Sequence, residues 1–325
     1  MKNGVGAVKS IGMKGVILDG YALNPGDLSY DCFSSIIPFD IYDSTDPADV
    51  LTRCKDADVV ITNKVPFDKA TMEALPNLKY IGVTATGYNI IDIEAARERG
   101  IAVTNIPAYS TDAVAQHVFA LLLAVSNAVE KHNESVKRGE WERSCSFCYW
   151  LTPLFELSGK TLGIIGLGNI GKKVASIANA FGMRVIAYSP HSRMDGVEAV
   201  TLDELLLSSD VLSLNCPLNE KTEKIINEES LGKMKMGSIL INASRGALVD
   251  EDAVIRALDS GRLSWYCADV LSLEPPRKNR LSMHEKSVIT PHIAWAPIET
   301  RQRLLSIAIS NLESFLSGKK ENRVV

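Results

Sequence analysis

The chain has 325 residues, of which 46% are hydrophobic and 23% charged, and its formal net charge is −4. This length accommodates two domains of ordinary size, and the composition is typical of a soluble globular protein. The small negative charge gives no electrostatic reason to expect nucleic acid or an anionic membrane as a partner, and no segment has the length and apolarity of a membrane span.

The N-terminal residues lack the apolar core of a secretory signal, and Met13 stands directly before the first strand-like run. Residues 1–12 therefore have two open interpretations, a tag remnant or an upstream start, and we expect a cytoplasmic protein. Cys145 and Cys148 have the C-x-x-C spacing, but no second pair or nearby histidine completes a metal site. We expect free thiols in a reducing compartment and no bound metal.

Short apolar runs alternate with helical segments over the first third of the chain. The runs are β-branched and bounded by turn residues, which predicts buried strands at residues 15–20, 57–62, 78–85 and 101–106. Helix-like stretches such as DPADVLTRCK and PFDKATMEAL separate them. Strand alternating with helix predicts parallel strands joined by right-handed crossovers.

Residues 110–141 predict one long helix, with Ser110 or Thr111 as its N-cap and apolar residues at helical spacing. Its middle, HVFALLLAVSNAV, is apolar on nearly every side, so we expect it to be buried between domains or at a subunit contact.

From Thr161 the alternation restarts and predicts six more strands, in the runs TLGIIG, RVIAY, DVLSLN, SILINA, WYCADV and SVITPHIA. Helices such as NIGKKVASIANAFG and DEDAVIRALDSG fill the gaps, the second ending at Gly261. A last helix follows Pro297. The predicted fold class is α/β.

The glycines of GLGNIG form the G-x-G-x-x-G pattern, at Gly166, Gly168 and Gly171. An apolar strand runs into this turn and a helix beginning near Asn169 leaves it. The glycines permit a tight turn, close approach of a pyrophosphate and close helix–strand packing, and the helix N-terminus attracts phosphate. The pattern therefore predicts a dinucleotide site; the alternative is an ordinary strand-to-helix turn.

The second strand of this unit ends in the sequence YSPHSR, where NAD-binding proteins carry an acidic residue for the ribose hydroxyls. Here Ser189 removes the repulsion that a carboxylate would exert on a 2′-phosphate. Ser192 can donate a hydrogen bond, and Arg193 and His191 can supply positive charge. We therefore expect NADP(H). The alternative is NAD(H), with Arg193 on a solvated loop.

Polar residues follow the later strands: Arg245, Asp269, Glu274 and His292. Ligands of open α/β sheets bind outside the carboxyl ends of the strands. We therefore expect these residues to share one cleft.

The motifs GLGNIG, NASRGALVDEDAVIRAL, ADVLSLEPP and TPHIAW, in this order and spacing, resemble the D-isomer-specific 2-hydroxyacid dehydrogenases. TATGYNIID, NIPAYSTDAVAQH and RGEWERS narrow the resemblance to the glycerate dehydrogenase and hydroxypyruvate reductase branch. The resemblance covers nearly the whole chain. It implies two doubly wound, Rossmann-like domains with an active-site cleft between them: residues 106–297 would bind the dinucleotide, and residues 1–105 plus 298–325 would bind substrate.

The resemblance implies an NAD(P)-dependent oxidoreductase that reduces a small 2-keto acid to the D-2-hydroxy acid, hydroxypyruvate to D-glycerate or glyoxylate to glycolate. It implies Arg245, Glu274 and His292 as the catalytic residues. An imidazole with an ordinary pKa near neutrality is suited to give the carbonyl oxygen a proton. Glu274 would orient the ring, and Arg245 would hold the substrate carboxylate and polarise the carbonyl.

Further contacts are implied by the resemblance alone. The cofactor would meet Asn169, Ile170, Cys216, Pro217, Ala243 and Asp269, the last at the nicotinamide amide. Thr86 and Gly87 would bind the substrate carboxylate. Trp141 would reach the active site of a partner subunit in a homodimer, or only pack in the dimer contact.

Three hypotheses follow: reduction of hydroxypyruvate, the same chemistry on another acid such as that of a D-lactate dehydrogenase, and a non-enzymatic NAD(P)-sensing scaffold. Because the chain ends after its final helix, we expect no C-terminal regulatory domain of the kind found in many phosphoglycerate dehydrogenases.

Overall fold

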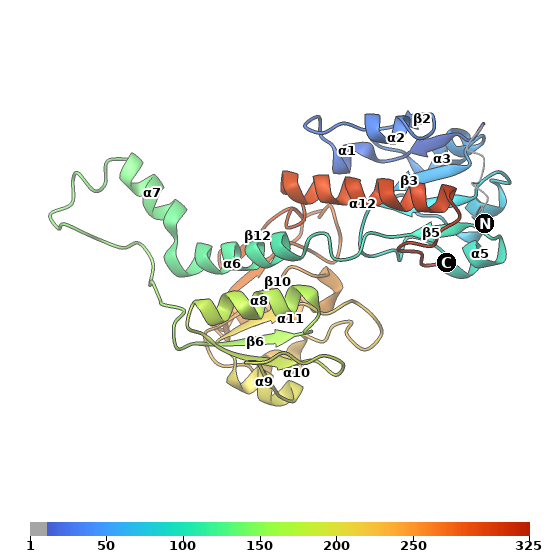
Figure 1. Ribbon diagram of the computed structural model, residues 1–325. Coiled ribbons are helices and arrows are strands. Elements are labelled where there is room, and N and C mark those ends of the chain that lie inside the picture. The colour runs from blue at the N-terminus through green and yellow to red at the C-terminus, as the bar shows by residue number, and fades with distance from the viewer. Residues whose placement is uncertain (1–11) are drawn as a thin grey trace. The chain divides into compact units, whose positions relative to one another are not determined.

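The computed structural model describes residues 12–325, so the interpretations of the first residues concern a segment outside the described part. The chain divides into two compact units (Figure 1). One runs to Tyr109 and resumes over Ala296–Val325, and the other spans Ser110–Trp295. Each unit is built on a parallel sheet, which confirms the predicted α/β class with two parallel-sheet domains.

The sheet of the first unit has five strands in the order β2-β1-β3-β4-β5. Their bounds are Gly15–Ile17 (β1), Phe39–Ile41 (β2), Val59–Thr62 (β3), Tyr80–Val83 (β4) and Ala102–Thr104 (β5). Four of them confirm the predicted strands. The fifth, β2, was not predicted. It is a largely exposed edge strand of three residues, preceded by Pro38 and interrupted by Asp40.

Helices of the first unit include a long C-terminal one, α12, which packs against β4 (Figure 1). The ring of Phe315 on α12 lies 4.8 Å from that of the fully buried Tyr80. The helical segments are Gly20–Leu23 (α1), Asp31–Ser34 (α2), Pro47–Asp49 (η1), Val50–Cys54 (α3), Lys69–Glu73 (α4), Ile93–Glu98 (α5) and Ile298–Leu316 (α12).

The sheet of the second unit has seven parallel strands in the order β12-β11-β10-β9-β6-β7-β8. Their bounds are Thr161–Ile165 (β6), Arg184–Tyr188 (β7), Glu198–Ala199 (β8), Val211–Leu214 (β9), Ser238–Asn242 (β10), Leu263–Ala268 (β11) and Ser287–Ile289 (β12). All six predicted strands are present. The two-residue edge strand β8 is exposed and was not predicted, because its sequence contains no apolar run.

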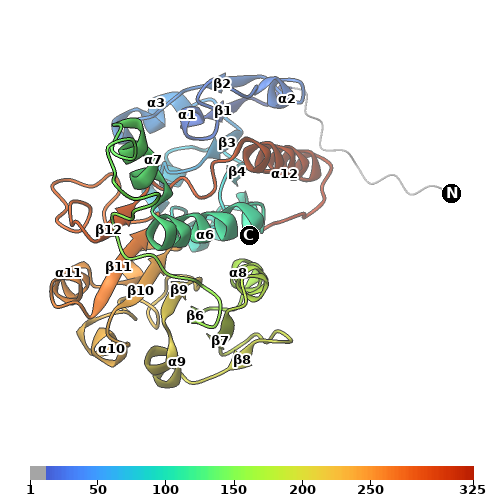
Figure 2. The same cartoon turned by 90° about the vertical axis from the view of Figure 1, so that its left-hand side faces the viewer.

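Helices cover both faces of this sheet (Figure 2). Because successive side chains of a strand point to opposite faces, β-strand residues divide between two cores. Leu162 and Ile164 join the core under α6 and α8, whereas Leu212 and Leu214 join the core on the side of α9, α10 and α11. The helical segments are Thr111–Asn127 (α6), Val129–Lys137 (α7), Asn169–Ala180 (α8), Leu202–Ser208 (α9), Glu228–Lys233 (α10), Gly246–Leu248 (η2) and Glu251–Asp259 (α11).

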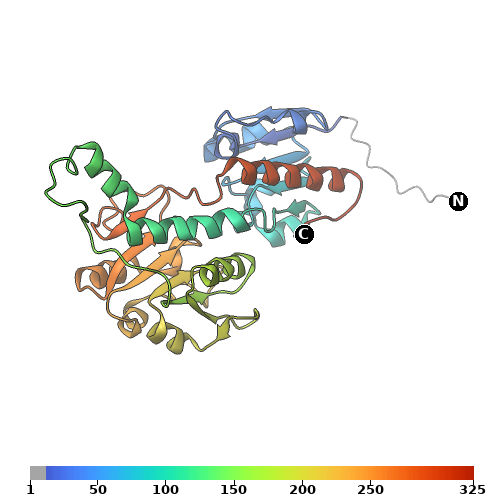
Figure 3. The same ribbon diagram turned by 60° about the vertical axis from the view of Figure 1, so that its left-hand side comes forward.

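The single long helix predicted for residues 110–141 is wrong. α6 ends at Asn127, and Ala128 adopts a left-handed conformation with φ of 46° before α7 begins. Figure 3 shows the resulting bend. Alanine is the best helix former, so the residue that adopts the left-handed conformation does not itself mark the break. Among the described residues no single helix is long and apolar enough to cross a membrane, and α6 and α7 would suffice only as a pair bent by 53°.

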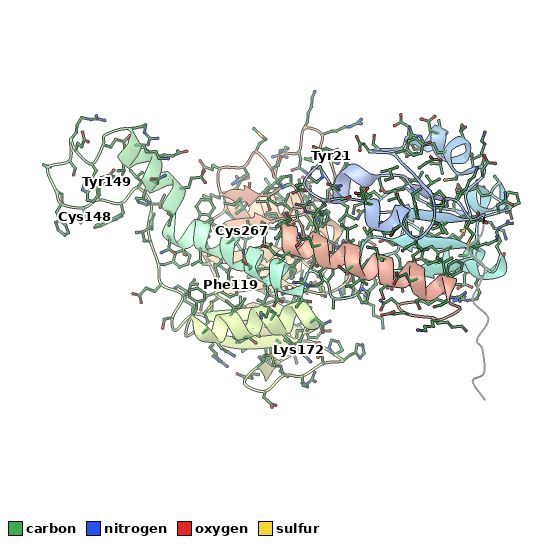
Figure 4. The ribbon with its side chains drawn as sticks, turned by 45° about the horizontal axis from the view of Figure 1, so that its top comes forward. Tyr21, Phe119, Cys148, Tyr149, Lys172 and Cys267 are labelled. Atoms are coloured by element: carbon green, nitrogen blue, oxygen red, sulfur yellow. The ribbon has the colours of Figure 1, made fainter. Side chains whose placement is uncertain are left out.

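The segment after α7 exposes large apolar side chains. Trp141 is 51% exposed, Phe147 87% and Trp150 68%. Figure 4 places Cys148 and Tyr149 on this segment. Cys145 and Cys148 are exposed free thiols.

Candidate active site

Six strands of the larger sheet end in one row. Backbone pairing aligns the last residues of neighbouring strands, in the order Tyr188, Ile165, Leu214, Asn242, Ala268 and Ile289. Since all these strands are parallel, the residues that follow them emerge at the same edge, about 4.8 Å apart from strand to strand. The glycine turn, Arg245, Asp269 and the His292 segment therefore all leave the sheet at its carboxyl edge.

At this edge, His292 and Glu274 form a close pair. The Nδ1 atom of His292 lies 2.6 Å from Oε2 of Glu274, and the two side chains are 29% and 34% exposed. An ionised carboxylate only accepts hydrogen bonds, so the imidazole donates from Nδ1. That assignment leaves Nε2 as the ring nitrogen able to exchange a proton with a ligand.

The turn after Arg245 packs against the segment that carries Glu274. A Cβ atom at Gly246 would lie 1.9 Å from the carbonyl carbon of Leu271, so only glycine permits this approach. Leu271 in turn donates its N–H to Oε1 of Glu274 over 2.9 Å. Contacts thus run from the Arg245 turn through Leu271 and Glu274 to His292. The guanidinium of Arg245 is exposed, and its Nη1 donates to the carbonyl of Ser244.

His292 occupies a strained backbone conformation, with φ of 55°, that non-glycine residues rarely adopt. Its N–H donates to the carbonyl of Thr290 over 2.9 Å. The next two residues, Ile293 and Ala294, donate their N–H groups to Oδ1 and Oδ2 of Asp269, each over 2.8 Å. Such strain persists only where the surroundings over-determine it, and Asp269 is the residue that fixes this turn.

Two side chains of this cluster were not predicted from the sequence. Thr290 Oγ1 lies 2.5 Å from Oδ1 of Asp269, and His117 Nε2 lies 2.9 Å from Thr290 Oγ1 and 3.4 Å from Oδ1 of Asp269. Between Ala113 and Asn127, His117 is the only ionisable side chain. A single ionisable residue in a largely apolar helix was the available indication.

The glycine turn fits a dinucleotide. Gly166 has φ of 94°, and a Cβ there would lie 2.7 Å from the backbone N of Cys216. A Cβ at Gly171 would lie 2.1 Å from the carbonyl oxygen of Gly166, so the helix approaches the strand closely. At Gly168, by contrast, a Cβ would meet nothing within 4 Å, which leaves open space in front of the α8 N-terminus. These are the three roles that the pattern predicts.

The first turn of α8 begins at Asn169 and Ile170, and no side chain caps it. Its backbone N–H groups therefore suit a phosphate. On the neighbouring strand end, the buried Oδ1 atom of Asn215 has no hydrogen-bond partner among the described residues, which suits a ligand donor. Burial raises the pKa of the Cys216 thiol to about 11, so Cys216 is a neutral packing residue.

The residues after β7 form a compact turn. Arg193 Nη1 donates to the carbonyl oxygens of Ser189, over 2.5 Å, and Ser192, over 2.9 Å. The guanidinium is therefore held beside Ser189, on a turn where Arg193 is exposed to solvent. His191 is exposed on the same turn.

The remaining predicted site residues are described by their own local contacts and exposure. Thr86 and Gly87 belong to the first unit, where the Thr86 hydroxyl donates to the carbonyl of Ile106 over 2.8 Å. Trp141 donates from Nε1 to the carbonyl of Phe147 over 3.0 Å. Pro217 is exposed and Ala243 half-buried, each just beyond its strand. Ligand contacts of these residues and of Asp269, whose side chain is 1% exposed, stay predictions.

Comparison with known proteins identifies the family. The profile of the D-isomer specific 2-hydroxyacid dehydrogenase, NAD binding domain, matches residues 119–294. A hydroxypyruvate reductase from Blautia hydrogenotrophica is 46% identical over 320 residues, covering 96% of this chain and 99% of the relative. A glycerate dehydrogenase from Methylorubrum extorquens is 40% identical, covering 87% of this chain and 90% of the relative. A solved acyclic imino acid reductase (Bsp5), in complex with NADPH and D-Arg, has a TM-score of 0.85 and 33% identity, covering 96% of this chain and 100% of that one. As its motifs predicted, the chain belongs to the D-isomer-specific 2-hydroxyacid dehydrogenases, in the branch of the glycerate dehydrogenases and hydroxypyruvate reductases.

Proposed function

We propose that this protein reduces hydroxypyruvate to D-glycerate, and glyoxylate to glycolate, with a nicotinamide cofactor. The observation that carries the proposal is the His292–Glu274 pair, 2.6 Å apart, at the same sheet edge as a glycine turn that fits a dinucleotide. The names of the two relatives, a hydroxypyruvate reductase and a glycerate dehydrogenase, support the choice of acid.

Reduction of a 2-keto acid needs a hydride at the carbonyl carbon and a proton at the carbonyl oxygen. The nicotinamide, when bound, supplies the hydride. His292 supplies the proton from Nε2, because Nδ1 is engaged by Glu274. In the reverse direction, the neutral imidazole accepts the hydroxyl proton at the same atom.

Glu274 and Arg245 support this proton transfer in different ways. Glu274 fixes the ring orientation through Nδ1 and is itself anchored by the Leu271 N–H, 2.9 Å from Oε1. Arg245 holds the substrate carboxylate and stabilises the charge that develops on the carbonyl oxygen. Among the described residues its exposed guanidinium donates to the Ser244 carbonyl, which leaves further N–H groups for a carboxylate. Thr86 and Gly87 would add backbone donors to that carboxylate.

The pyrophosphate would lie on the glycine turn and on the backbone N–H groups of Asn169 and Ile170. Cys216, Pro217 and Ala243 would line the dinucleotide further along the sheet edge, and Asp269 would meet the nicotinamide amide. For the cofactor itself we propose NADP(H) over NAD(H). Arg193, held beside Ser189 with no acidic residue at that position, suits a 2′-phosphate, and Ser192 and His191 would complete this subsite.

The proposal extends to a homodimer. Trp141, Phe147 and Trp150 expose apolar surface on one segment, and exposed apolar clusters of this kind mark contact sites. A second copy of the chain would cover them, and Trp141 would lie at the partner's active site. Size-exclusion chromatography with light scattering tests this, and a monomer at micromolar concentration would contradict it.

One absorbance assay tests the activity. NADPH or NADH oxidation is followed with hydroxypyruvate, glyoxylate, pyruvate and a branched 2-keto acid, with His292→Ala as the matched control. We expect the highest kcat/KM for hydroxypyruvate with NADPH. A higher kcat/KM for pyruvate or the branched acid would contradict the proposed substrate and indicate a D-2-hydroxyacid dehydrogenase of another specificity. If no acid causes cofactor oxidation, the enzymatic proposal fails and only a cofactor-sensing role remains.

A further inference from the structure

Behind the turn that carries His292 lies a buried polar cluster formed by Asp269, Thr290 and His117. These residues come from the ends of β11 and β12 and from α6. The side chain of Asp269 is 1% exposed and that of His117 17% exposed. A polar group is retained in such a place only where its hydrogen bonds are made, so the partners of His117 show what it does.

The donor and the acceptor of each hydrogen bond in this cluster can be assigned. Both oxygens of Asp269 already accept backbone N–H groups, from Ile293 and Ala294, so the carboxylate is an acceptor toward Thr290 as well. Thr290 has one hydroxyl proton, and its Oγ1 is 2.5 Å from Oδ1 of Asp269. That proton points to Asp269. His117 must then donate from Nε2 to Thr290 Oγ1, over 2.9 Å.

These hydrogen bonds link α6 to the backbone of His292. Asp269 holds the N–H groups of the two residues after His292, and Thr290 is two residues before it. His292 itself has φ of 55°, a conformation its own side chain disfavours. The orientation of the Asp269 carboxylate therefore sets where the imidazole stands, and the Thr290 hydroxyl helps to set that orientation.

We propose that His117 is a positioning residue for His292, acting through Thr290 and Asp269. This inference rests on the proposed function, in which His292 is the proton donor. His117 touches neither substrate nor cofactor in this scheme. Its N–H fixes the Thr290 hydroxyl and keeps the imidazole of His292 aligned for proton transfer.

Matched variants test the N–H donor rather than the volume of the side chain. His117→Leu removes the donor, whereas His117→Gln keeps an N–H at similar reach. We expect His117→Leu to lower kcat at least tenfold, with the KM for hydroxypyruvate and the cofactor Kd within threefold of wild type. His117→Gln should recover kcat to within threefold of wild type.

A second pair guards against misfolding of the His117 variants. Thr290→Val removes the hydroxyl at nearly constant volume, and Thr290→Ser keeps it. Thr290→Val should lower kcat like His117→Leu, and Thr290→Ser should not. The double variant His117→Leu/Thr290→Val should lower kcat no further than the less active of the two single variants, because both residues act through the same series of hydrogen bonds. Multiplicative losses would overturn the proposal.

A readout without cofactor or turnover completes the test. The chain has five histidines, so the imidazole Cε1–H resonance of His292 is identified by its absence in His292→Ala. In the cofactor-free protein, His117→Leu should shift or broaden that resonance and His117→Gln should leave it unchanged. If wild type reduces no keto acid while the resonance responds, the proposed function fails and the positioning role stands. If wild type is active and His117→Leu changes neither kcat nor the resonance, even with a lower melting temperature, His117 only fills space and the proposal is overturned.

Discussion

Two residues at the carboxyl edge of the larger sheet have left-handed backbone conformations, and they reach them in opposite ways. Gly166 has φ of 94° and no side chain, and the missing Cβ is what lets the backbone of Asn215 and Cys216 approach. His292 has φ of 55° and keeps a side chain that the conformation disfavours. At the first turn the absence of a side chain suits a bound ligand, whereas at the second the side chain is the proton donor that we propose.

The difference explains how each turn is held. Glycine pays no steric cost for positive φ, so the Gly166 turn needs little support beyond its strand and helix. The His292 turn needs external hydrogen bonds, and Asp269 supplies acceptors to Ile293 and Ala294. A glycine at position 292 would relieve the strain but would remove the imidazole. At His292, hydrogen bonds to the buried Asp269 carboxylate therefore hold a positive φ that glycine would adopt unaided, and the imidazole is kept.

The largest expected effect follows from removing the imidazole. His292→Ala should lower kcat for hydroxypyruvate by about two orders of magnitude or more, because general acid catalysis is lost. Cofactor Kd, measured by fluorescence titration, should change less than threefold because the Gly166 turn is untouched. Turnover near the wild-type value would remove His292 from the mechanism.

The glycine turn offers a matched pair of equal chemical changes. Gly166→Ala should destabilise the protein by about 2 kcal/mol or more, because it combines positive φ with a Cβ 2.7 Å from backbone. Gly168→Ala should change the free energy of unfolding by less than about 0.5 kcal/mol, since its Cβ meets nothing within 4 Å.

The same pair should behave differently toward cofactor. Gly168→Ala fills the open space before α8, so NADPH Kd should rise at least about tenfold in a protein of normal stability. Urea unfolding and fluorescence titration measure the two quantities. Equal stabilities for both variants, or tight binding by Gly168→Ala, would contradict the roles assigned to these glycines.

The two turns also differ in how far the sequence revealed them. The glycine turn, its strand and its helix were predictable because glycines stand in the sequence at the positions where the backbone of such a turn requires them. The strain at His292 and its support by Asp269 were not, since no residue type marks them. His117 comes from α6, more than 170 positions before Thr290, so only the fold brings the two together.

Elements missed elsewhere share physical reasons. The edge strands β2 and β8 have only three and two residues and are largely exposed, and each contains an acidic residue, so neither shows the continuous β-branched run that identifies a buried strand. The break between α6 and α7 occurs at Ala128, where local preference favours a continuous helix. The three proposed catalytic residues, Arg245, Glu274 and His292, came from a family resemblance. The structure adds the contacts that run from the turn after Arg245 through Leu271 to Glu274.

A third change tests cofactor choice at the strand beside the glycine turn. The double variant Ser189→Asp/Arg193→Ala places a carboxylate where NAD-binding proteins have one and removes the cation. We expect the ratio of kcat/KM for NADPH to that for NADH to fall by about tenfold or more, with the Gly166 turn unaltered. The single variant Arg193→Ala is the control and should give a smaller change. An unchanged ratio would show that this turn does not meet the 2′-position.

The strain at His292 can be measured by comparing two inactive variants. His292→Gly should be more stable than His292→Ala by about 0.5–1 kcal/mol, since only glycine adopts positive φ without steric cost. Both lack the imidazole, so loss of the Glu274 interaction cancels. Urea unfolding gives the difference. If the alanine variant is the more stable, the Asp269 hydrogen bonds hold no appreciable strain at this position.

The smallest expected effect lies at the opposite, amino edge of the same sheet, where the ionisable group serves stability rather than chemistry. Burial alone would raise the pKa of Asp210, but the N–H of Thr161, 2.8 Å from Oδ2, and Lys235 Nζ, 2.9 Å from Oδ1, outweigh burial and lower it. A carboxyl pKa that is lowered on folding stabilises the protein fully above the unfolded pKa of about 3.9, and the contribution is lost as pH falls through the folded value. Asp210→Asn should therefore be less stable than wild type at pH 7, by less than about 1 kcal/mol because the pair is partly exposed, and the difference should shrink below about pH 4. Urea unfolding across pH measures this, with kcat at pH 7 as the control. If the stability difference widened on acidification, the lowered pKa of Asp210 would not be its cause. If kcat fell, Asp210 would affect the chemistry at the carboxyl edge as well as stability.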